Sequence, residues 1–123
     1  MIRPNTVLLV SGGHDALEDI SDFVRPTQTV RQHEQVVIAG MGEVGKAAHS
    51  VISEEEIDTV TVDIDDHEGV DIVADAGSKT TLQEAGTEDA GAIIVGLPDD
   101  SSSFLTTVLA RSLDSSIEVL VRV

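Results

Sequence analysis

The chain has 123 residues, 41% of them hydrophobic, which is enough for one domain with a single core. It carries 23 Asp and Glu against 7 Lys and Arg, a net charge of −16. Because so acidic a surface repels phosphate backbones, nucleic acid is excluded as a partner. Cysteine is absent, which excludes disulfides, zinc thiolate sites and thiol catalysis and is compatible with a reducing cytoplasm.

Strand and helix patterns follow one another along the chain. A buried strand is predicted at 6–10 and an amphipathic helix at 15–24, followed by a polar, proline-interrupted linker at 26–35. Beyond it, apolar and β-branched runs predict strands at 36–39, 59–62, 71–74, 92–96 and 117–122. Apolar residues at helical spacing predict helices at 43–54, 79–85 and 100–113. This alternation indicates an α/β fold in which helices cover both faces of a parallel, doubly wound sheet.

The predicted helix at 100–113 has a distinct apolar side. Phe104, Leu105, Val108 and Leu109 recur at helical spacing, and we expect this face to be partly core and partly available for pairing with another lobe. The serines at 101–103 follow two aspartates, which favours a helix N-cap over a nucleophile.

A glycine motif joins the strand at 36–39 to the helix at 43–54. Gly40, Gly42 and Gly45 form G-x-G-x-x-G between them, the pattern of a dinucleotide-binding βαβ unit. Gly40 permits a tight turn, Gly42 lets the backbone approach a pyrophosphate, and Gly45 allows close packing of helix on sheet. The pyrophosphate would lie at the N-terminus of the helix. The alternative is a glycine turn in a fold that has lost its ligand.

Asp63 lies eighteen residues beyond Gly45, at the end of the next predicted strand. A carboxylate there can accept both ribose hydroxyls of an adenosine and would repel the 2′-phosphate of NADP, which favours NAD or NADH. The alternative is a solvated loop acid.

Residues 36–123 resemble the RCK, KTN or TrkA-N domain that regulates potassium channels and Trk-type potassium transporters. The matching residues are the glycine turn 40–45, the run 62–65, Ala74-Asp75-Ala76, the segments 82–86 and 89–90, and Gly96 through Ser103. The resemblance implies a Rossmann-like fold and a regulatory, non-catalytic domain. It also implies a nucleotide ligand, a homodimer or larger assembly, and a location at the cytoplasmic face of a membrane potassium channel or transporter.

The resemblance also implies that Asp75 and Ala76 line the adenine, and that the loop at 96–98 lies beside the other half of the ligand. Together with the glycine motif and Asp63, the predicted nucleotide-binding residues are Gly40, Met41, Gly42, Glu43, Val44, Gly45, Asp63, Ile64, Asp65, Asp75, Ala76, Gly96, Leu97 and Pro98. No catalytic or metal-binding residue is predicted.

Three departures from the family pattern bear on the ligand. Ala74 replaces the usual glycine, and only seven residues separate Asp63 from Asp71, so a loop or a single turn is expected where the family has a helix. Glu43 stands where several members have an arginine that reaches the terminal phosphates. A carboxylate beside a triphosphate is unfavourable. The ranking is therefore NAD or NADH first, ADP or AMP as alternatives, and ATP last.

The first 25 residues resemble the closing strand and helix of the family's other lobe, TrkA-C or RCK-C. This predicts three segments: an arm at 1–25, a linker at 26–35 and a nucleotide-binding TrkA-N lobe at 36–123, all within a fragment of a longer protein. The alternatives for 1–25 are an arm that docks on the lobe and a linker from a pore.

Two other functions use the same fold: an NAD-dependent oxidoreductase, and a scaffold lobe without a ligand. No acid–base residue is evident near the expected nicotinamide, which argues against the first. The acidic cluster at 63–68 misses the EF-hand spacing and is expected to be a solvated loop. Uniform acidity with only two lysines, Lys46 and Lys79, is typical of cytoplasmic proteins adapted to high salt, where ions screen self-repulsion.

Overall fold

A computed structural model describes residues 7–10, 35–55, 57–115 and 117–122. Within these ranges the strands form one parallel sheet in the order β1-β6-β5-β2-β3-β4. The strands are β1 (Val7–Val10), β2 (Val36–Ala39), β3 (Thr59–Asp63), β4 (Ile72–Val73), β5 (Ala92–Val95) and β6 (Glu118–Arg122). The chain adds β3 and β4 on one side of β2, then crosses to add β5 and β6 on the other. This reversal beside β2 is where open α/β sheets bind ligands.

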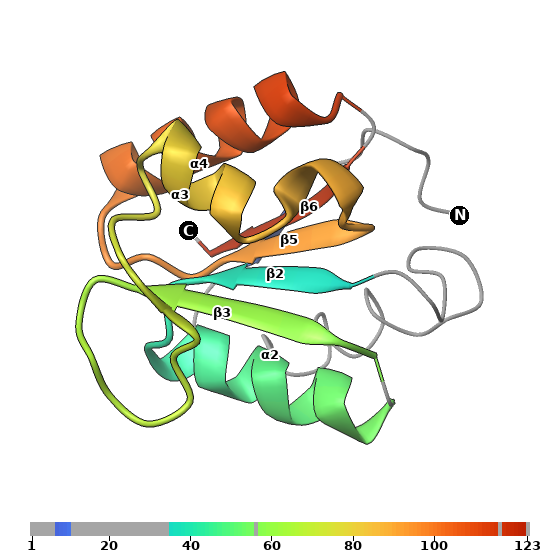
Figure 1. The fold of residues 1–123 in the computed structure, drawn as a ribbon, viewed down its shortest axis with the longest axis vertical. Helices are drawn as coiled ribbons and strands as arrows, with labels where there is room; N and C mark the ends of the chain where they lie inside the picture. The colour runs from blue at the N-terminus through green and yellow to red at the C-terminus, as the bar shows by residue number, and fades with distance from the viewer. Residues whose placement is uncertain (1–6, 11–34, 56, 116, 123) are drawn as a thin grey trace.

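Helices cover the two faces of the sheet (Figure 1). Helix α2 (Glu43–Glu54) lies on one face, and α3 (Lys79–Glu84), the short helix η1 (Thr87–Asp89) and α4 (Asp100–Leu113) lie on the other. No helix in the described part of the chain is long and apolar enough to cross a membrane.

Side-chain alternation along the strands builds two cores. Val36, Ile38, Ala92 and Ile94 pack with Leu120 toward α2. Their neighbours in the same strands point to the opposite face and pack with α3 and α4; they are Val37, Ala39, Ile93, Val95 and Val119. A strand buried on both sides reads as a continuous apolar run, which is why β2 and β5 were recognisable from the sequence.

The predicted doubly wound α/β fold is confirmed. Helices α2 and α4 begin and end as predicted, and the strands from β2 onward differ from the predicted ranges by at most one residue at either end. The structure forms no helix between Asp63 and Asp71, as the short spacing indicated. The predicted helix at 15–24 and nearly all of the linker lie outside the described residues.

The apolar side of α4 is partly core, as predicted: Leu109 is half-buried and packs against the core, whereas Phe104, Leu105 and Val108 are exposed, Phe104 by 72%. Its availability for pairing stays a prediction. The fully buried positions of α4 are Ser103, Thr106 and Ala110. Small residues face inward because α4 lies close to the sheet and to α3. The N-cap is Asp99, not a serine: its Oδ2 accepts hydrogen bonds from Ser102 N (2.9 Å) and from Ser102 Oγ (2.8 Å).

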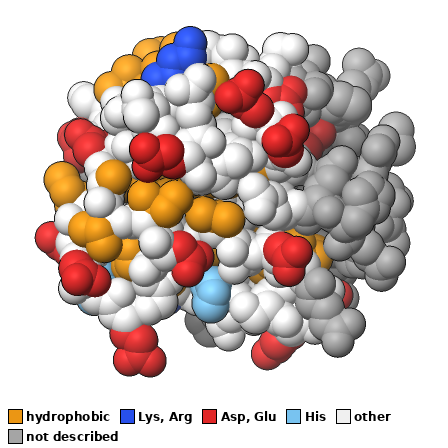
Figure 2. All heavy atoms as spheres, in the orientation of Figure 1, with side chains coloured by type: hydrophobic (Ala, Val, Ile, Leu, Met, Phe, Trp, Pro, Cys, Tyr) orange, Lys and Arg blue, Asp and Glu red, His pale blue; other side chains and the backbone are white. Residues whose placement is uncertain are grey.

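Acidic side chains are scattered over the visible face of the molecule in Figure 2, whereas the Lys and Arg colour is confined to one small patch at its upper edge. This distribution agrees with acids that are spread along the chain instead of being concentrated in a tail.

Candidate functional site

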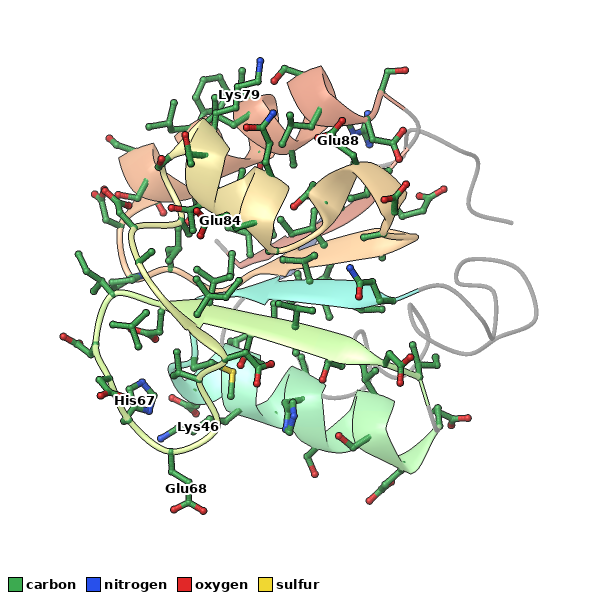
Figure 3. The ribbon with its side chains drawn as sticks, viewed as in Figure 1. Lys46, His67, Glu68, Lys79, Glu84 and Glu88 are labelled. Atoms are coloured by element: carbon green, nitrogen blue, oxygen red, sulfur yellow. The ribbon has the colours of Figure 1, made fainter. Side chains whose placement is uncertain are left out.

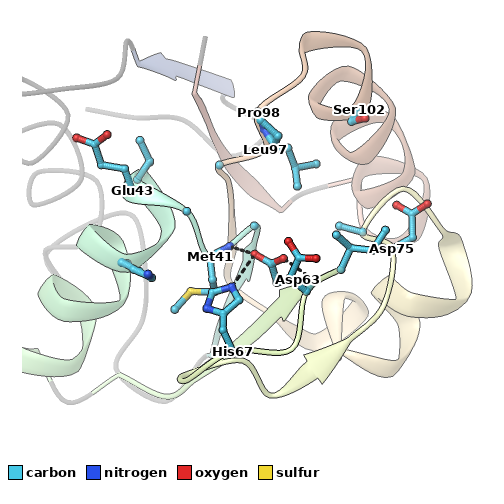
Figure 4. A pocket seen from close by; sticks show the side chains of 16 residues that line it. Met41, Glu43, Asp63, His67, Asp75, Leu97, Pro98 and Ser102 are labelled. Atoms are coloured by element: carbon cyan, nitrogen blue, oxygen red, sulfur yellow. Dashed lines mark hydrogen bonds and ion pairs between the residues drawn. The ribbon is translucent and has the colours of Figure 1, made fainter.

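A cavity of about 720 Å³ opens at the carboxyl ends of β2, β3 and β5. The loops that follow these strands supply its walls, together with the loop after β4 and the first turns of α2 and α4 (Figure 4). The lining residues are Gly40, Met41, Gly42, Glu43, Val44, Lys46, Asp63, Ile64, Asp65, His67, Asp75, Ala76, Gly96, Leu97, Pro98 and Ser102.

The cavity brings together every residue of the predicted site except Gly45. These residues are far apart in the sequence and come from four loops, so their convergence follows from the parallel sheet alone. Gly45 lies behind the lining, where α2 meets the sheet. That these residues hold a nucleotide stays a prediction.

The glycines of the loop serve different geometric needs. A Cβ atom on Gly45 would lie 1.9 Å from the carbonyl oxygen of Gly40, so α2 could not approach β2 with any other residue there. Gly40 has a φ of +96°, and its Cβ would lie 2.7 Å from the oxygen of Gly96. A Cβ on Gly42, by contrast, would have no heavy atom within 4 Å. Gly42 is therefore the one glycine of the motif that leaves space open instead of permitting close packing.

The N-terminus of α2 faces this open space. Gly42 is the N-cap of α2 and provides no side chain to cap the first amides of the helix. These N–H groups and the helix dipole favour an anion at this position. Glu43 is exposed, and its carboxylate points away from Asp63 in Figure 4, which leaves the loop backbone accessible.

Asp63 ties the end of β3 to the glycine loop. Its Oδ2 accepts a hydrogen bond from Met41 N (2.7 Å), and its Oδ1 accepts one from Asp65 N (2.9 Å). His67 Nε2 lies 3.4 Å from Oδ2, an ion pair when the imidazole is protonated. Partial burial acts to raise the pKa of Asp63, but the two backbone hydrogen bonds and His67 outweigh it, so the pKa lies below its usual value. The carboxylate is thus ionised and fixed in position at the floor of the cavity.

The loop between β3 and β4 is held by Thr61 and Asp71. Thr61 N donates to Asp71 Oδ2 (3.0 Å), and Asp71 N donates to Thr61 Oγ1 (2.8 Å). The Thr61 hydroxyl in turn donates to the carbonyl oxygen of Gly69. These bonds tie the far end of the loop back to β3, and His67, in its middle part, lines the cavity.

Asp75 and Ala76 form the wall contributed by the loop after β4. Asp75 Oδ1 accepts a hydrogen bond from Gly77 N (2.8 Å), which closes a local turn. Ala76 is 4% exposed, and its carbonyl oxygen accepts a hydrogen bond from Thr106 Oγ1 (3.2 Å) of α4. The position of this wall is therefore fixed by α4.

Three lining residues were not predicted: Lys46, His67 and Ser102. Lys46 is one turn along α2 from Gly42, and this spacing places both residues on one side of the helix. Lys46 is therefore the one of the three whose place in the cavity has a recognisable signal in the sequence. His67 and Ser102 reach the cavity through the course of a loop and the packing of α4, for which the sequence has no local pattern. Within the described ranges, no group of acidic and histidine residues is arranged to hold a metal ion.

The fold and the cavity define a Rossmann-like α/β domain with its candidate ligand site at the switch point of the sheet. The TrkA-N domain family model matches residues 36–123, and the chain belongs to this family. The resemblance predicted from the glycine turn and the motifs that follow it is thereby confirmed.

Solved structures of RCK and related domains are similar to this chain. The GsuK RCK domain is 29% identical with a TM-score of 0.65, over 72% of this chain and 20% of that one. The GsuK channel bound to NAD is 29% identical with a TM-score of 0.67, over 73% of this chain and 17% of that one. The Kef CTD of Shewanella denitrificans in AMP-bound form shares the fold at 21% identity and a TM-score of 0.66, over 71% of this chain and 56% of that one. The chain thus spans about a fifth of each of these two GsuK chains. No curated protein matches it.

Proposed function

We propose that this chain is a regulatory domain that binds an adenine nucleotide, with NAD or NADH favoured, and thereby controls potassium transport through a membrane channel or transporter. The observation that carries this proposal is the cavity at the switch point of the sheet, which unites the open glycine loop with an ionised Asp63. The NAD-bound GsuK channel and the AMP-bound Kef CTD support a nucleotide ligand.

The proposed ligand lies along the cavity in a defined direction. Its pyrophosphate contacts the backbone of Gly42 and the first amides of α2. The adenosine ribose donates its hydroxyl groups to the free lone pairs of Asp63, and the adenine lies toward Asp75 and Ala76. The second half of a dinucleotide extends along the loop at 96–98.

A regulatory role fits the chemistry of the cavity better than catalysis. The titratable side chains that line it are Glu43, Lys46, Asp63, Asp65, His67 and Asp75, which belong to the glycine loop, to α2 and to the adenosine side. Along the loop at 96–98 and the start of α4, Ser102 is the polar side chain among the lining residues. A hydride transfer needs a positioned acid or base close to the nicotinamide. This end of the cavity offers none among its described lining residues.

Control of a pore requires that the ligand bind two arrangements of the assembly with different affinity. We propose that the domain pairs as a homodimer or within a larger assembly, at the cytoplasmic face of the transporter. The exposed side of α4, with Phe104, Leu105 and Val108, is available for such pairing. The division into an arm at 1–25, a linker at 26–35 and a lobe at 36–123 is part of this proposal.

Calorimetric titration with NAD, NADH, ADP, AMP and ATP in high KCl tests the proposal. We expect binding of NAD or NADH to be tightest, and we expect Asp63→Ala to weaken it at least tenfold. Asp66→Ala is the matched control, because Asp66 is exposed in the same loop and does not line the cavity. Absence of binding to any adenine nucleotide would refute the function, and unchanged affinity in Asp63→Ala would refute the site. Turnover of NADH with carbonyl substrates would instead establish an oxidoreductase.

A further inference from the structure

Lys46 is the one lysine that lines the cavity; the other, Lys79, begins α3 and is not among the lining residues. Figure 3 shows Lys46 extending from α2 toward the loop that carries His67, with Lys79 at the opposite side of the molecule. The position is notable in a chain of net charge −16, whose cavity is lined by four carboxylates, Glu43, Asp63, Asp65 and Asp75.

The geometry of α2 directs Lys46 to the open end of the glycine loop. Lys46 N donates to the carbonyl oxygen of Gly42, so its Cα stands one turn above the N-cap. In an α-helix the Cα–Cβ bond tilts toward the N-terminus, and a long side chain therefore covers the preceding turn. The ammonium group can reach the space next to Gly42, where a Cβ would have no neighbour within 4 Å.

The charge of Lys46 is available to a ligand. Among the described residues that line the cavity, His67 forms an ion pair with Asp63. Lys46 has no ion-pair partner among the residues that the structure describes. Glu43 lies three residues earlier on α2, the spacing of a surface pair, but both side chains are exposed, and such exposed pairs contribute little. A dianionic pyrophosphate would compete successfully for such a cation.

We propose that Lys46 is the phosphate-binding cation of this cavity and that it selects nucleotides with at least two phosphates, such as ADP and NAD, over AMP and adenosine. This inference rests on the proposed nucleotide function and names a residue for its phosphate contact. A single lysine at the helix N-terminus neutralises part of the charge of a diphosphate, while adenosine makes no contact with it.

The test compares Lys46→Gln with the matched control Lys79→Gln. Glutamine and lysine have similar helix propensities, so both variants keep their helices, which circular dichroism verifies. In 0.2 M and 2 M KCl, calorimetric titration with adenosine, AMP, ADP and NAD measures the affinities. A partly exposed charge-assisted contact corresponds to a five- to tenfold change, so Lys46→Gln should weaken ADP and NAD binding by about that factor in 0.2 M KCl and by less in 2 M KCl. Adenosine binding should stay the same, and Lys79→Gln should match the wild type.

Lys46→Arg supplies a second criterion, because it restores the charge without restoring the exact side chain. It should bind ADP within about twofold of the wild type. Equal ADP affinity in Lys46→Gln and wild type would overturn the inference while leaving the nucleotide function intact. An equal loss for adenosine and ADP would also overturn it, by revealing a merely structural role. A wild-type protein that binds none of the four ligands would refute the proposed function and this inference together.

Discussion

Replacing Gly42 by Val should separate nucleotide binding from folding. In the folded protein the new Cβ would have no heavy atom within 4 Å, and a φ of −81° is one that any residue adopts. The remaining cost is the poorer preference of valine for a helix N-cap, about 1 kcal/mol. The same side chain would occupy the space in which we propose the pyrophosphate. Two charge-assisted hydrogen bonds lost at about 1.5 kcal/mol each amount to about 3 kcal/mol, or roughly a hundredfold in affinity.

The assay pairs thermal unfolding with calorimetric titration of NAD and ADP, both in molar KCl. Gly45→Ala is the informative control, because its Cβ would lie 1.9 Å from the Gly40 carbonyl oxygen and α2 would have to move. It should lose about 3 kcal/mol of stability, a far larger loss than Gly42→Val shows. Wild-type affinity in Gly42→Val would refute the position assigned to the phosphates. A Gly42→Val protein as unstable as Gly45→Ala would refute the reasoning about open space.

Three further results are expected. Because hydrogen bonds keep the pKa of Asp63 below its ordinary value of about 3.9, its contribution to stability is complete above that pH and is lost as the pH falls through the lower, folded-state pKa. Acid titrations followed by circular dichroism should therefore show a smaller loss of stability at low pH in Asp63→Asn than in the wild type; equal losses would contradict this. The net charge of −16 predicts a higher melting temperature in 2 M KCl than in dilute buffer, and equal melting temperatures would rule out adaptation to salt. Finally, Glu43→Gln should strengthen ADP binding about threefold by removing a carboxylate beside the phosphates, and an unchanged dissociation constant would show that Glu43 stays in solvent.

Local patterns determined much of the fold. The apolar runs of β2 and β5 and the helical spacing of Val44, Ala48 and Ile52 are properties of neighbouring residues, so they were readable before any packing was known. The glycine motif was also readable, because its spacing is imposed by a single turn between one strand and one helix.

The inward face of α4 could not be read in the same way. Its apolar residues Phe104, Leu105 and Val108 satisfy the helical period, yet the sheet and α3 accept the smaller Ser103, Thr106 and Ala110. A prediction from hydrophobic periodicity assumes that the larger apolar side chains are buried. In α4 the close approach of the helix to the sheet and to α3 instead selects small residues for the buried side.

By itself, the sequence determined the element order, the glycine turn and the acid at the end of β3, because each depends on residues that are close together along the chain. The tertiary structure alone decided which side chains share the cavity. Lys46 and His67 both line the cavity because α2 and the loop after β3 both begin at the switch point of the sheet. Such proximity depends on strand order, which is a long-range property, and no local pattern encodes it.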